Sequence, residues 1–280
     1  MKIITQISEL REMLDIEKRQ TQSIGFVPTM GFLHEGHLSL IQEARQDNDI
    51  VVLSIFVNPL QFGPNEDFDK YPRDMARDEE LAKNAGVDYL FYPTVLEMYG
   101  DKQTVTVKVH ERTDVMCGKS RPGHFDGVAT VLTKLFTIVQ PTCVYFGLKD
   151  AQQVAVVEGL IHDFNFPIKL VGVEIKREKD GLALSSRNIN LTEKERKEAP
   201  NIYKSLCKVK EELEKESHYA VALEKGKQFL QEHISGEIEY FVGLSYPELE
   251  EITDMTQKII FAVAVQYTSV RLIDNMIVNL

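Results

Sequence analysis

Two histidines separated by a glutamate and a glycine, His34-Glu35-Gly36-His37, have the types and spacing to bind a phosphate. They follow a short apolar run at residues 24–29 and precede apolar residues at helical spacing in 37–46. A helix N-terminus offers free N–H groups to an anion, and imidazoles three residues apart can share one face. The spacing fits a nucleotide triphosphate and two unrelated surface histidines equally well. A zinc site is less favoured, because no third ligand is evident.

A second polar cluster is Gly147-Leu148-Lys149-Asp150, which follows an apolar strand at residues 143–146 and opens a helix bearing Gln152 and Gln153. A lysine there can neutralise phosphate charge, and a glutamine can bond a substrate hydroxyl or carboxylate. The structural alternative is a glycine turn with a solvated Lys-Asp pair.

Two further segments carry polar groups in loops. Residues 181–188 contain Leu184, Ser185, Ser186 and Arg187, which suit phosphate oxygens or form a polar linker. Residues 56–64 place Gln61 between aromatic side chains, where it could bind a small polar substrate or complete a packed turn.

The elements that must position these residues alternate between strands and helices. Residues 49–57 form a near-continuous apolar run, as expected for a parallel strand covered on both faces. The remaining pattern predicts helices at 73–84, 127–139 and 151–164, and strands at 87–92, 104–109 and 168–175. We therefore predict an α/β fold with a doubly wound parallel sheet. Three of the four polar clusters follow strand ends, so they are expected to meet in one crevice.

The composition changes near Leu191, where Thr192 and Glu195 have the spacing of a helix capping box. Charge-rich helices are expected up to about residue 234, with strands at 237–245 and 258–265, followed by residues 271–275. These segments predict a smaller C-terminal α+β domain. The domain boundary is placed between 176 and 190, giving domains 1–178 and 179–280.

The bulk composition is that of a globular protein, with 43% hydrophobic and 27% charged residues. No run of eighteen apolar residues predicts a membrane span, and the net charge of −11 argues against nonspecific binding to nucleic acid. The first residues lack a signal-peptide pattern, and three widely spaced cysteines argue against a disulfide framework. A cytoplasmic protein is expected.

The chain also resembles the pantothenate synthetase (pantoate–β-alanine ligase) family, one of the nucleotidyltransferases that carry this histidine motif. The resemblance begins with the ATP signature at residues 28–37, PTMGFLHEGH. It continues through IFVNPLQFGPNEDFDKYPR (55–73), RPGHFDGVATV (121–131), FGLKDAQQ (146–153), DGLALSSRN (180–188) and RLIDN (271–275).

The resemblance implies a Rossmann-like first domain, a smaller C-terminal domain that acts as a lid, and a homodimer. It implies that pantoate and Mg-ATP form pantoyl-adenylate and pyrophosphate, and that β-alanine then displaces AMP. His34, His37 and Lys149 would be catalytic, with His37 the proton donor, while Gln61 and Gln153 would hold pantoate and Gln61 would also lie near β-alanine. ATP would be bound by Met30, Gly31, Phe32, Leu33, His34, Glu35, Gly36, His37, Gly147, Leu148, Lys149, Asp150, Lys176, Leu184, Ser185, Ser186 and Arg187.

Leu148 and Ala151 depart from the family, which favours a polar or charged residue and an aromatic one there. Magnesium is implied by ATP, and its nearby candidate ligands are Asp67, Asp69, Asp78 and Asp150. The competing hypotheses are a related nucleotidyltransferase that leaves AMP on its product and a non-catalytic ATP-binding module.

Overall fold

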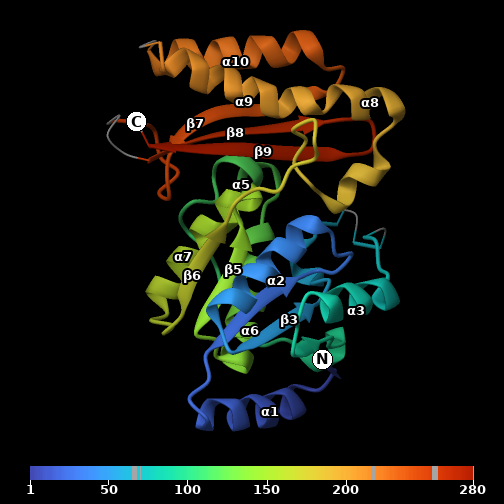
Figure 1. Ribbon diagram of the computed structural model, residues 1–280. Helices are drawn as coiled ribbons and strands as arrows, with labels where there is room; N and C mark the ends of the chain where they lie inside the picture. The colour runs from blue at the N-terminus through green and yellow to red at the C-terminus, as the bar shows by residue number, and fades with distance from the viewer. Residues whose placement is uncertain (65–67, 70, 216–217, 254–257, 280) are drawn as a thin grey trace.

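The computed structural model describes residues 1–64, 68–69, 71–215, 218–253 and 258–279, and it contains two sheets, one above the other in Figure 1. The first is a six-stranded parallel sheet with strand order β1-β4-β3-β2-β5-β6. Its strands are β1 (Lys2–Ile4), β2 (Ile24–Thr29), β3 (Ile50–Ile55), β4 (Tyr89–Phe91), β5 (Cys143–Gly147) and β6 (Lys169–Val173).

Helices cover both faces of this sheet because successive strand residues point to opposite sides. Phe26 and Val144 pack in one core with α1 (Ile7–Arg19), α6 (His124–Val139) and α7 (Ala151–Asp163). Their neighbours Val27 and Tyr145 pack in the other core with α2 (Glu35–Asp47) and α3 (Met75–Asn84). Burial on both faces explains the apolar runs without polar alternation.

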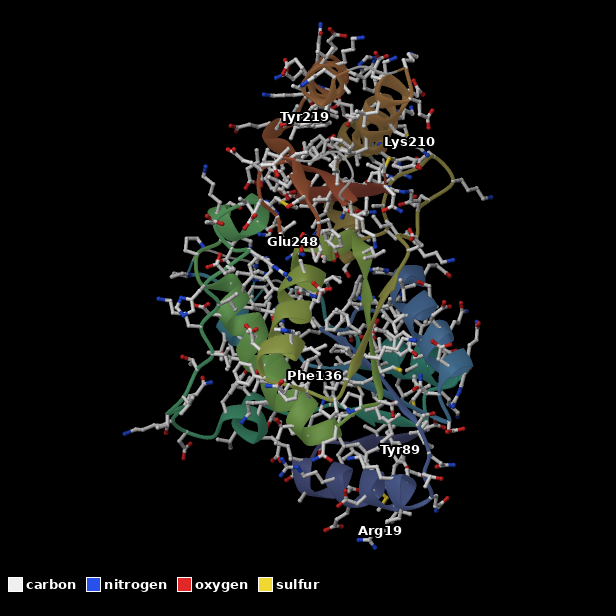
Figure 2. All side chains as sticks on the ribbon, turned by 90° about the vertical axis from the view of Figure 1, so that its left-hand side faces the viewer. Arg19, Tyr89, Phe136, Lys210, Tyr219 and Glu248 are labelled. Atoms are coloured by element: carbon white, nitrogen blue, oxygen red, sulfur yellow. The ribbon has the colours of Figure 1, made fainter. Side chains whose placement is uncertain are left out.

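The second sheet is antiparallel, with β8 between β7 and β9. Its strands and helices are β7 (Glu237–Ser245), β8 (Lys258–Gln266), β9 (Arg271–Asn279), α8 (Glu193–Glu198), α9 (Pro200–Leu213) and α10 (Tyr219–His233). In Figure 2, Lys210 and Tyr219 mark the helical layer at the outer end of this unit, and Phe136 marks α6 in the first.

Strand β8 is buried on both faces, and each face belongs to a different core. Phe261 and Val263 pack under α9 and α10, within the C-terminal unit. Ile260 and Ala262 point the other way and pack with Ala151 of α7 and with Met116 of the short helix α5 (Met116–Ser120). The two units therefore share an apolar contact.

The predicted fold class is confirmed, since the parallel sheet is doubly wound and the C-terminal unit is a smaller α+β structure. The capping box at Thr192 and Glu195 is present. The boundary between residues 178 and 179 stays a prediction. Among the helices of the described residues, none is long and apolar enough to cross a membrane.

The strand predicted at residues 104–109 is wrong, because this segment joins no sheet. It lies against α6, where the Val107 N–H donates to Thr130 Oγ1 at 2.9 Å and the Val109 N–H donates to Asp126 Oδ1 at 2.8 Å. Side chains of α6 thus accept hydrogen bonds from the amides of Val107 and Val109, which in a sheet would donate to a neighbouring strand. The alternating sequence is explained by one face that packs on a helix.

Candidate active site

The candidate site lies at the carboxyl ends of β2 and β5, which are hydrogen-bonded neighbours at the centre of the sheet. From β2 the chain passes through α2 to β3 on one side, and from β5 it passes through α7 to β6 on the other. This reversal leaves a crevice at the strand ends, where open α/β sheets bind ligands. The crevice holds the segments after β2 and after β5, as the sequence predicts.

The turn between β2 and α2 has an unusual backbone conformation. Gly31 has φ +85° and Phe32 has φ +51°, so two successive residues adopt positive φ. The carboxylate of Asp78 on α3 fixes this turn, because Oδ2 accepts from the Phe32 N–H and Oδ1 accepts from the Leu33 N–H, both at 2.7 Å. Asp78 lies behind the turn, outside the pocket that the histidines line.

The two histidines also cap helix α2. The Gly36 N–H donates to His34 Nδ1 at 3.1 Å, and the His34 N–H donates to His37 Nδ1 at 3.3 Å. Their ring centroids are 4.1 Å apart. Since each Nδ1 accepts a hydrogen bond, the hydrogen of each neutral imidazole is on Nε2. Neither Nε2 bonds to another residue in the described part of the chain, so each can donate its N–H to a phosphate oxygen.

Both imidazoles are neutral near pH 7. Burial, followed by the charge of Lys149, lowers the pKa of His34 to about 4. Burial also holds the pKa of His37 well below its usual value, and His34 and Lys149 lower it further. The histidines are thus hydrogen-bond donors that carry no positive charge near pH 7.

We expect the depressed pKa of His34 to make stability depend on pH. Its pKa is about 4 when folded and 6.5 when exposed, so the unfolded chain binds more protons between these values. The contribution is complete above about pH 6.5 and is lost as the pH falls towards 4. Replacing His34 by asparagine, itself a good helix cap, should shrink the loss of unfolding free energy measured in urea across this window. An equal loss in both proteins would contradict the assignment.

Gly36 leaves room for the imidazole ring of His34. A Cβ at this position would lie 2.9 Å from Cε1 of His34, so a larger residue would displace the capping ring. The glycine therefore positions His34.

The segment after β5 brings a permanent cation to the same pocket. Lys149 lines it, with its side chain 20% exposed and its Nζ 3.8 Å from Asp150 Oδ2. Because the histidines are neutral, the permanent positive charges among the described lining residues are Lys149, Lys176 and Arg187. A chain of net charge −11 thus gathers cations where a triphosphate would bind.

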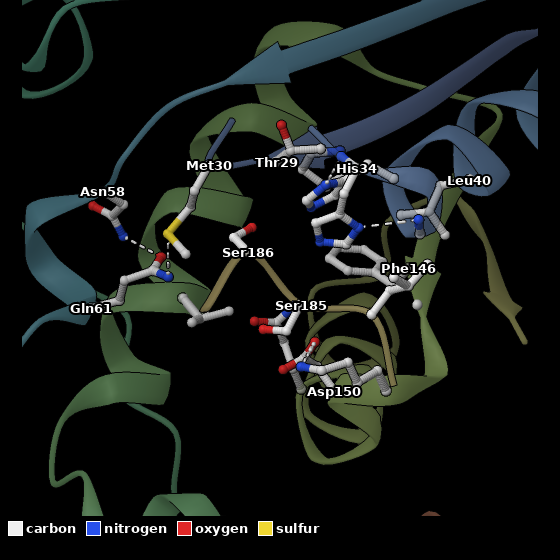
Figure 3. Close-up of a pocket in the computed structure, with 18 of the residues that line it drawn as sticks. Thr29, Met30, His34, Leu40, Asn58, Gln61, Phe146, Asp150, Ser185 and Ser186 are labelled. Atoms are coloured by element: carbon white, nitrogen blue, oxygen red, sulfur yellow. Dashed lines mark hydrogen bonds and ion pairs between the residues drawn. The ribbon is translucent and has the colours of Figure 1, made fainter. Parts of the chain in front are cut away.

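The opposite end of the pocket holds Gln61 and Asn58, with Met30 beside them (Figure 3). The Gln61 side chain is buried; its Oε1 accepts from Asn58 Nδ2 at 3.1 Å and its Nε2 contacts Met30 Sδ at 3.2 Å. The Gln61 carbonyl lies 2.8 Å from His124 Nδ1. Sequence reasoning assigned no role to Asn58 or His124, although both lie in the quoted family segments.

The segment at residues 185–187 lies across from the histidines. Ser185 Oγ accepts from the Arg187 N–H at 3.3 Å, and Ser186 Oγ lies 3.5 Å from the Phe32 carbonyl oxygen. The Arg187 guanidinium lies over the ring of Tyr71, 5.8 Å from its centroid. The loop between the sheets thus contacts the turn after β2.

Most of the predicted site residues meet in this pocket. Those that line it are Met30, His34, Gly36, His37, Gln61, Gly147, Lys149, Asp150, Gln153, Lys176, Leu184, Ser185, Ser186 and Arg187. Those that do not are Gly31, Phe32, Leu33, Glu35 and Leu148. Leu33 is in the core, Glu35 is exposed and Leu148 packs against β6 near Gly172. Ala151 is buried in the contact between the units.

Replacing Asp78 by alanine should weaken both folding and the ATP binding that the sequence predicts. It would leave the Phe32 and Leu33 N–H groups unpaired at a site where Asp78 is 1% exposed, a loss of about 1–3 kcal/mol in the free energy of unfolding. An Asp78→Asn variant keeps one acceptor oxygen and should have an intermediate effect. Urea unfolding and ATP titration measure the two effects, and unchanged values for the alanine variant would refute this role.

The doubly wound sheet and the polar pocket at its switch point place the chain in the class of α/β proteins that bind a ligand at the carboxyl ends of their strands. The sequence profile described as pantoate-beta-alanine ligase matches residues 2–277. The chain belongs to the pantoate–β-alanine ligase family, and it is an enzyme that condenses pantoate with β-alanine.

Relatives match along the whole chain. A pantothenate synthetase of Bacillus anthracis is 56% identical over 277 residues, covering 99% of this chain and 98% of the relative. The crystal structure of pantothenate synthetase from Thermus thermophilus matches with a TM-score of 0.94 and 44% identity over 99% of each chain. A pantoate-beta-alanine ligase from Francisella tularensis, complexed with beta-gamma ATP and β-alanine, matches with a TM-score of 0.81 and 34% identity over 99% of this chain and 97% of that one.

Proposed function

We propose that this pocket joins pantoate to β-alanine through a pantoyl-adenylate. The observation that carries the proposal is the meeting of His34, His37 and Lys149 from two neighbouring strand ends, with Gln61 at the far end of the same pocket. A triphosphate against the cationic end would place its α-phosphorus towards an acid held at the glutamine end. The Francisella relative, whose structure contains an ATP compound and β-alanine, supports both substrates.

The reaction needs two transfers. A carboxylate resists attack by an amine because its leaving group would be oxide. A pantoate oxygen therefore first attacks the α-phosphorus and pyrophosphate leaves; the amine of β-alanine then attacks the acyl carbon, AMP leaves and the amine loses a proton. Neither transfer uses a protein nucleophile, so catalysis consists of orientation and stabilisation of negative charge.

The geometry suggests a role for each group. His34 and His37 donate Nε2–H to phosphate oxygens, and the triphosphate raises the low pKa of His37 so that it can protonate the leaving pyrophosphate. Lys149 stabilises the transferring α-phosphate, while Ser185, Ser186 and Arg187 hold the triphosphate. Main chain around Gly147 and Lys176 contacts the adenosine.

Gln61 and Gln153 hold pantoate. The contact of the Gln61 Nε2–H with the sulfur of Met30 is weak, so this group can instead donate to a pantoate oxygen. Gln61 also lies near β-alanine in this arrangement.

We further propose that ATP brings Mg²⁺ to the pocket. Magnesium is usually held by phosphates, water and one or two carboxylates, and the carboxylates among the described lining residues are Asp150 and Glu174. Asp150 is the better candidate because it adjoins Lys149, which is proposed to bind the α-phosphate, and so it lies near the phosphate oxygens that would share the metal. Asp69 is exposed, Asp78 binds backbone amides and Asp67 lies outside the described residues. Chelation by EDTA should stop turnover, and added Mg²⁺ should restore it.

The identity of the nucleotide product tests the adenylate. Pantoate alone should support exchange of labelled pyrophosphate into ATP, and AMP should be released only when β-alanine is added. Formation of ADP and phosphate would reject the adenylate. An AMP group retained on the product would indicate a related nucleotidyltransferase, and ATP binding without pyrophosphate release would indicate a non-catalytic module.

The resemblance to the family also supports a cytoplasmic homodimer in which the C-terminal domain, residues 179–280, acts as a lid over residues 1–178. Light scattering should then give twice the 32.0 kDa of one chain. A mass of one chain at micromolar concentration would reject the dimer.

A further inference from the structure

The segment Arg271–Asn275 belongs to β9, the strand of the C-terminal sheet that lies towards the first domain (Figure 1). The mechanism above gives it no role. Asn275 is nonetheless 4% exposed, and its amide reaches out of its own domain. Its Nδ2 donates to the carbonyl oxygens of Leu148 at 2.8 Å and Lys149 at 2.9 Å.

These two carbonyls determine the direction of the Lys149 side chain. The Leu148 carbonyl belongs to the peptide plane before the Lys149 Cα, and the Lys149 carbonyl belongs to the plane after it. Because each peptide unit is rigid and planar, holding both oxygens restricts the φ and ψ that Lys149 can adopt. The direction of the Cα–Cβ bond, and hence the region that Nζ can reach, then follows.

Asn275 is itself held in place. It pairs with Ala262 of β8, and its N–H donates to Asp274 Oδ1 at 2.8 Å. Asp274 is 3% exposed and accepts from both terminal nitrogens of Arg177, at 2.5 and 2.9 Å. Arg177 follows Lys176 of the pocket wall and also stacks over Tyr203, 3.7 Å from the ring centroid. Asn275 is thus held in place by the buried Asp274 carboxylate, which is itself paired with Arg177.

We propose that Asn275 is a positioning residue for Lys149. By holding the carbonyls of Leu148 and Lys149, this residue of the second domain directs the Lys149 ammonium into the pocket of the first. The inference rests on the role proposed for Lys149. Two hydrogens on one nitrogen match two acceptors, whereas a residue serving only to fill the contact between the domains would need no donor. The amide acts on the main chain and does not touch the substrate.

A double-mutant cycle tests this proposal in the full-length enzyme, using pantoate-dependent exchange of pyrophosphate into ATP. Asn275→Ala alone should lower kcat about 10- to 100-fold, since a displacement near 1 Å costs up to about 10²-fold, and should leave the KM for ATP within about 3-fold. In a Lys149→Ala background the same change should cost less than about 3-fold, because residues that act through one another are not additive.

Multiplying penalties, or a single variant with normal kcat, would overturn the proposal. Near-normal turnover of Lys149→Ala alone would instead reject the role of Lys149, so the two failures are distinguishable. If Asn275→Ala does not fold, Asn275→Ser, which keeps one donor, enters the same cycle and should show the same loss of coupling to Lys149→Ala with a smaller single penalty.

Asn48 provides a matched control for the loss of a buried amide. It is 7% exposed, its Nδ2 also makes two hydrogen bonds, and it lies at the opposite end of α2 from the histidines. Asn48→Ala should lower the melting temperature but leave kcat unchanged and independent of Lys149. Equal kinetic effects of Asn48→Ala and Asn275→Ala would show that destabilisation alone explains the result, against the proposal.

Discussion

Replacement of Lys149 by alanine is expected to lower turnover about 10²- to 10³-fold, the usual cost of losing one group that stabilises transition-state charge. The physical reason is that both histidines beside Lys149 are neutral at pH 7, so they cannot replace its positive charge. Lys149 adjoins the histidines closely enough to lower the pKa of each. Rapid-quench measurement of adenylate formation would report the effect directly.

Lys149→Met is the matched variant, because it keeps most of the length of the side chain and removes the charge. It should be as slow as the alanine variant, while ATP binding measured by calorimetry weakens far less than turnover. A methionine variant within tenfold of the wild-type rate would show that packing, not charge, is the contribution of Lys149.

Replacement of His37 by asparagine is expected to lower turnover by about 10²-fold or more without loss of folding stability. The two ring nitrogens have separate tasks, since Nδ1 accepts from the His34 N–H and Nε2 remains for the phosphates. An asparagine oxygen can replace Nδ1 only, whereas a glutamine amide nitrogen reaches the position of Nε2. His37→Gln should therefore retain more activity.

Melting temperatures and kcat of the two variants separate capping from catalysis. Asparagine should preserve the melting temperature and lose kcat, and glutamine should show the reverse preference. If both variants lost activity in proportion to stability, the contribution of His37 would be structural.

The sequence predicted the central strands β2, β3 and β5 well because they are largely buried on both faces and therefore read as apolar runs. The edge strand β1, which is mostly exposed, was not predicted. The strands at 24–29 and 143–146 required no tertiary information, and with them the histidines and Lys149 could be placed at one edge. The prediction failed at 104–109, where alternation reflected packing on α6 and not pairing. Alternation of apolar and polar residues indicates that one face of a segment is buried, but it does not show whether a strand or a helix covers that face.

The residues that support the site were not predictable in the same way. Asp78 and Asn275 bind main-chain groups 45 and 126 positions away in the chain, and nothing in their local sequence shows such partners. Asn58 and His124 lay in recognised segments, but their roles arise only when η1 (Pro59–Gln61) packs against α6. The sequence pattern located the groups that line the pocket, and the three-dimensional packing revealed the residues that hold them.

The two-sided burial of β8 also limits how the enzyme can open. A hinge that swung the C-terminal unit away would expose Ile260, Ala262, Ala151 and Ala155 to water, at about 25 cal/mol for each square ångström of apolar surface. Because that exposure has a cost, we expect the two units to stay in contact while substrates enter. Asn275 would then keep its hydrogen bonds to the carbonyls of Leu148 and Lys149 throughout the catalytic cycle.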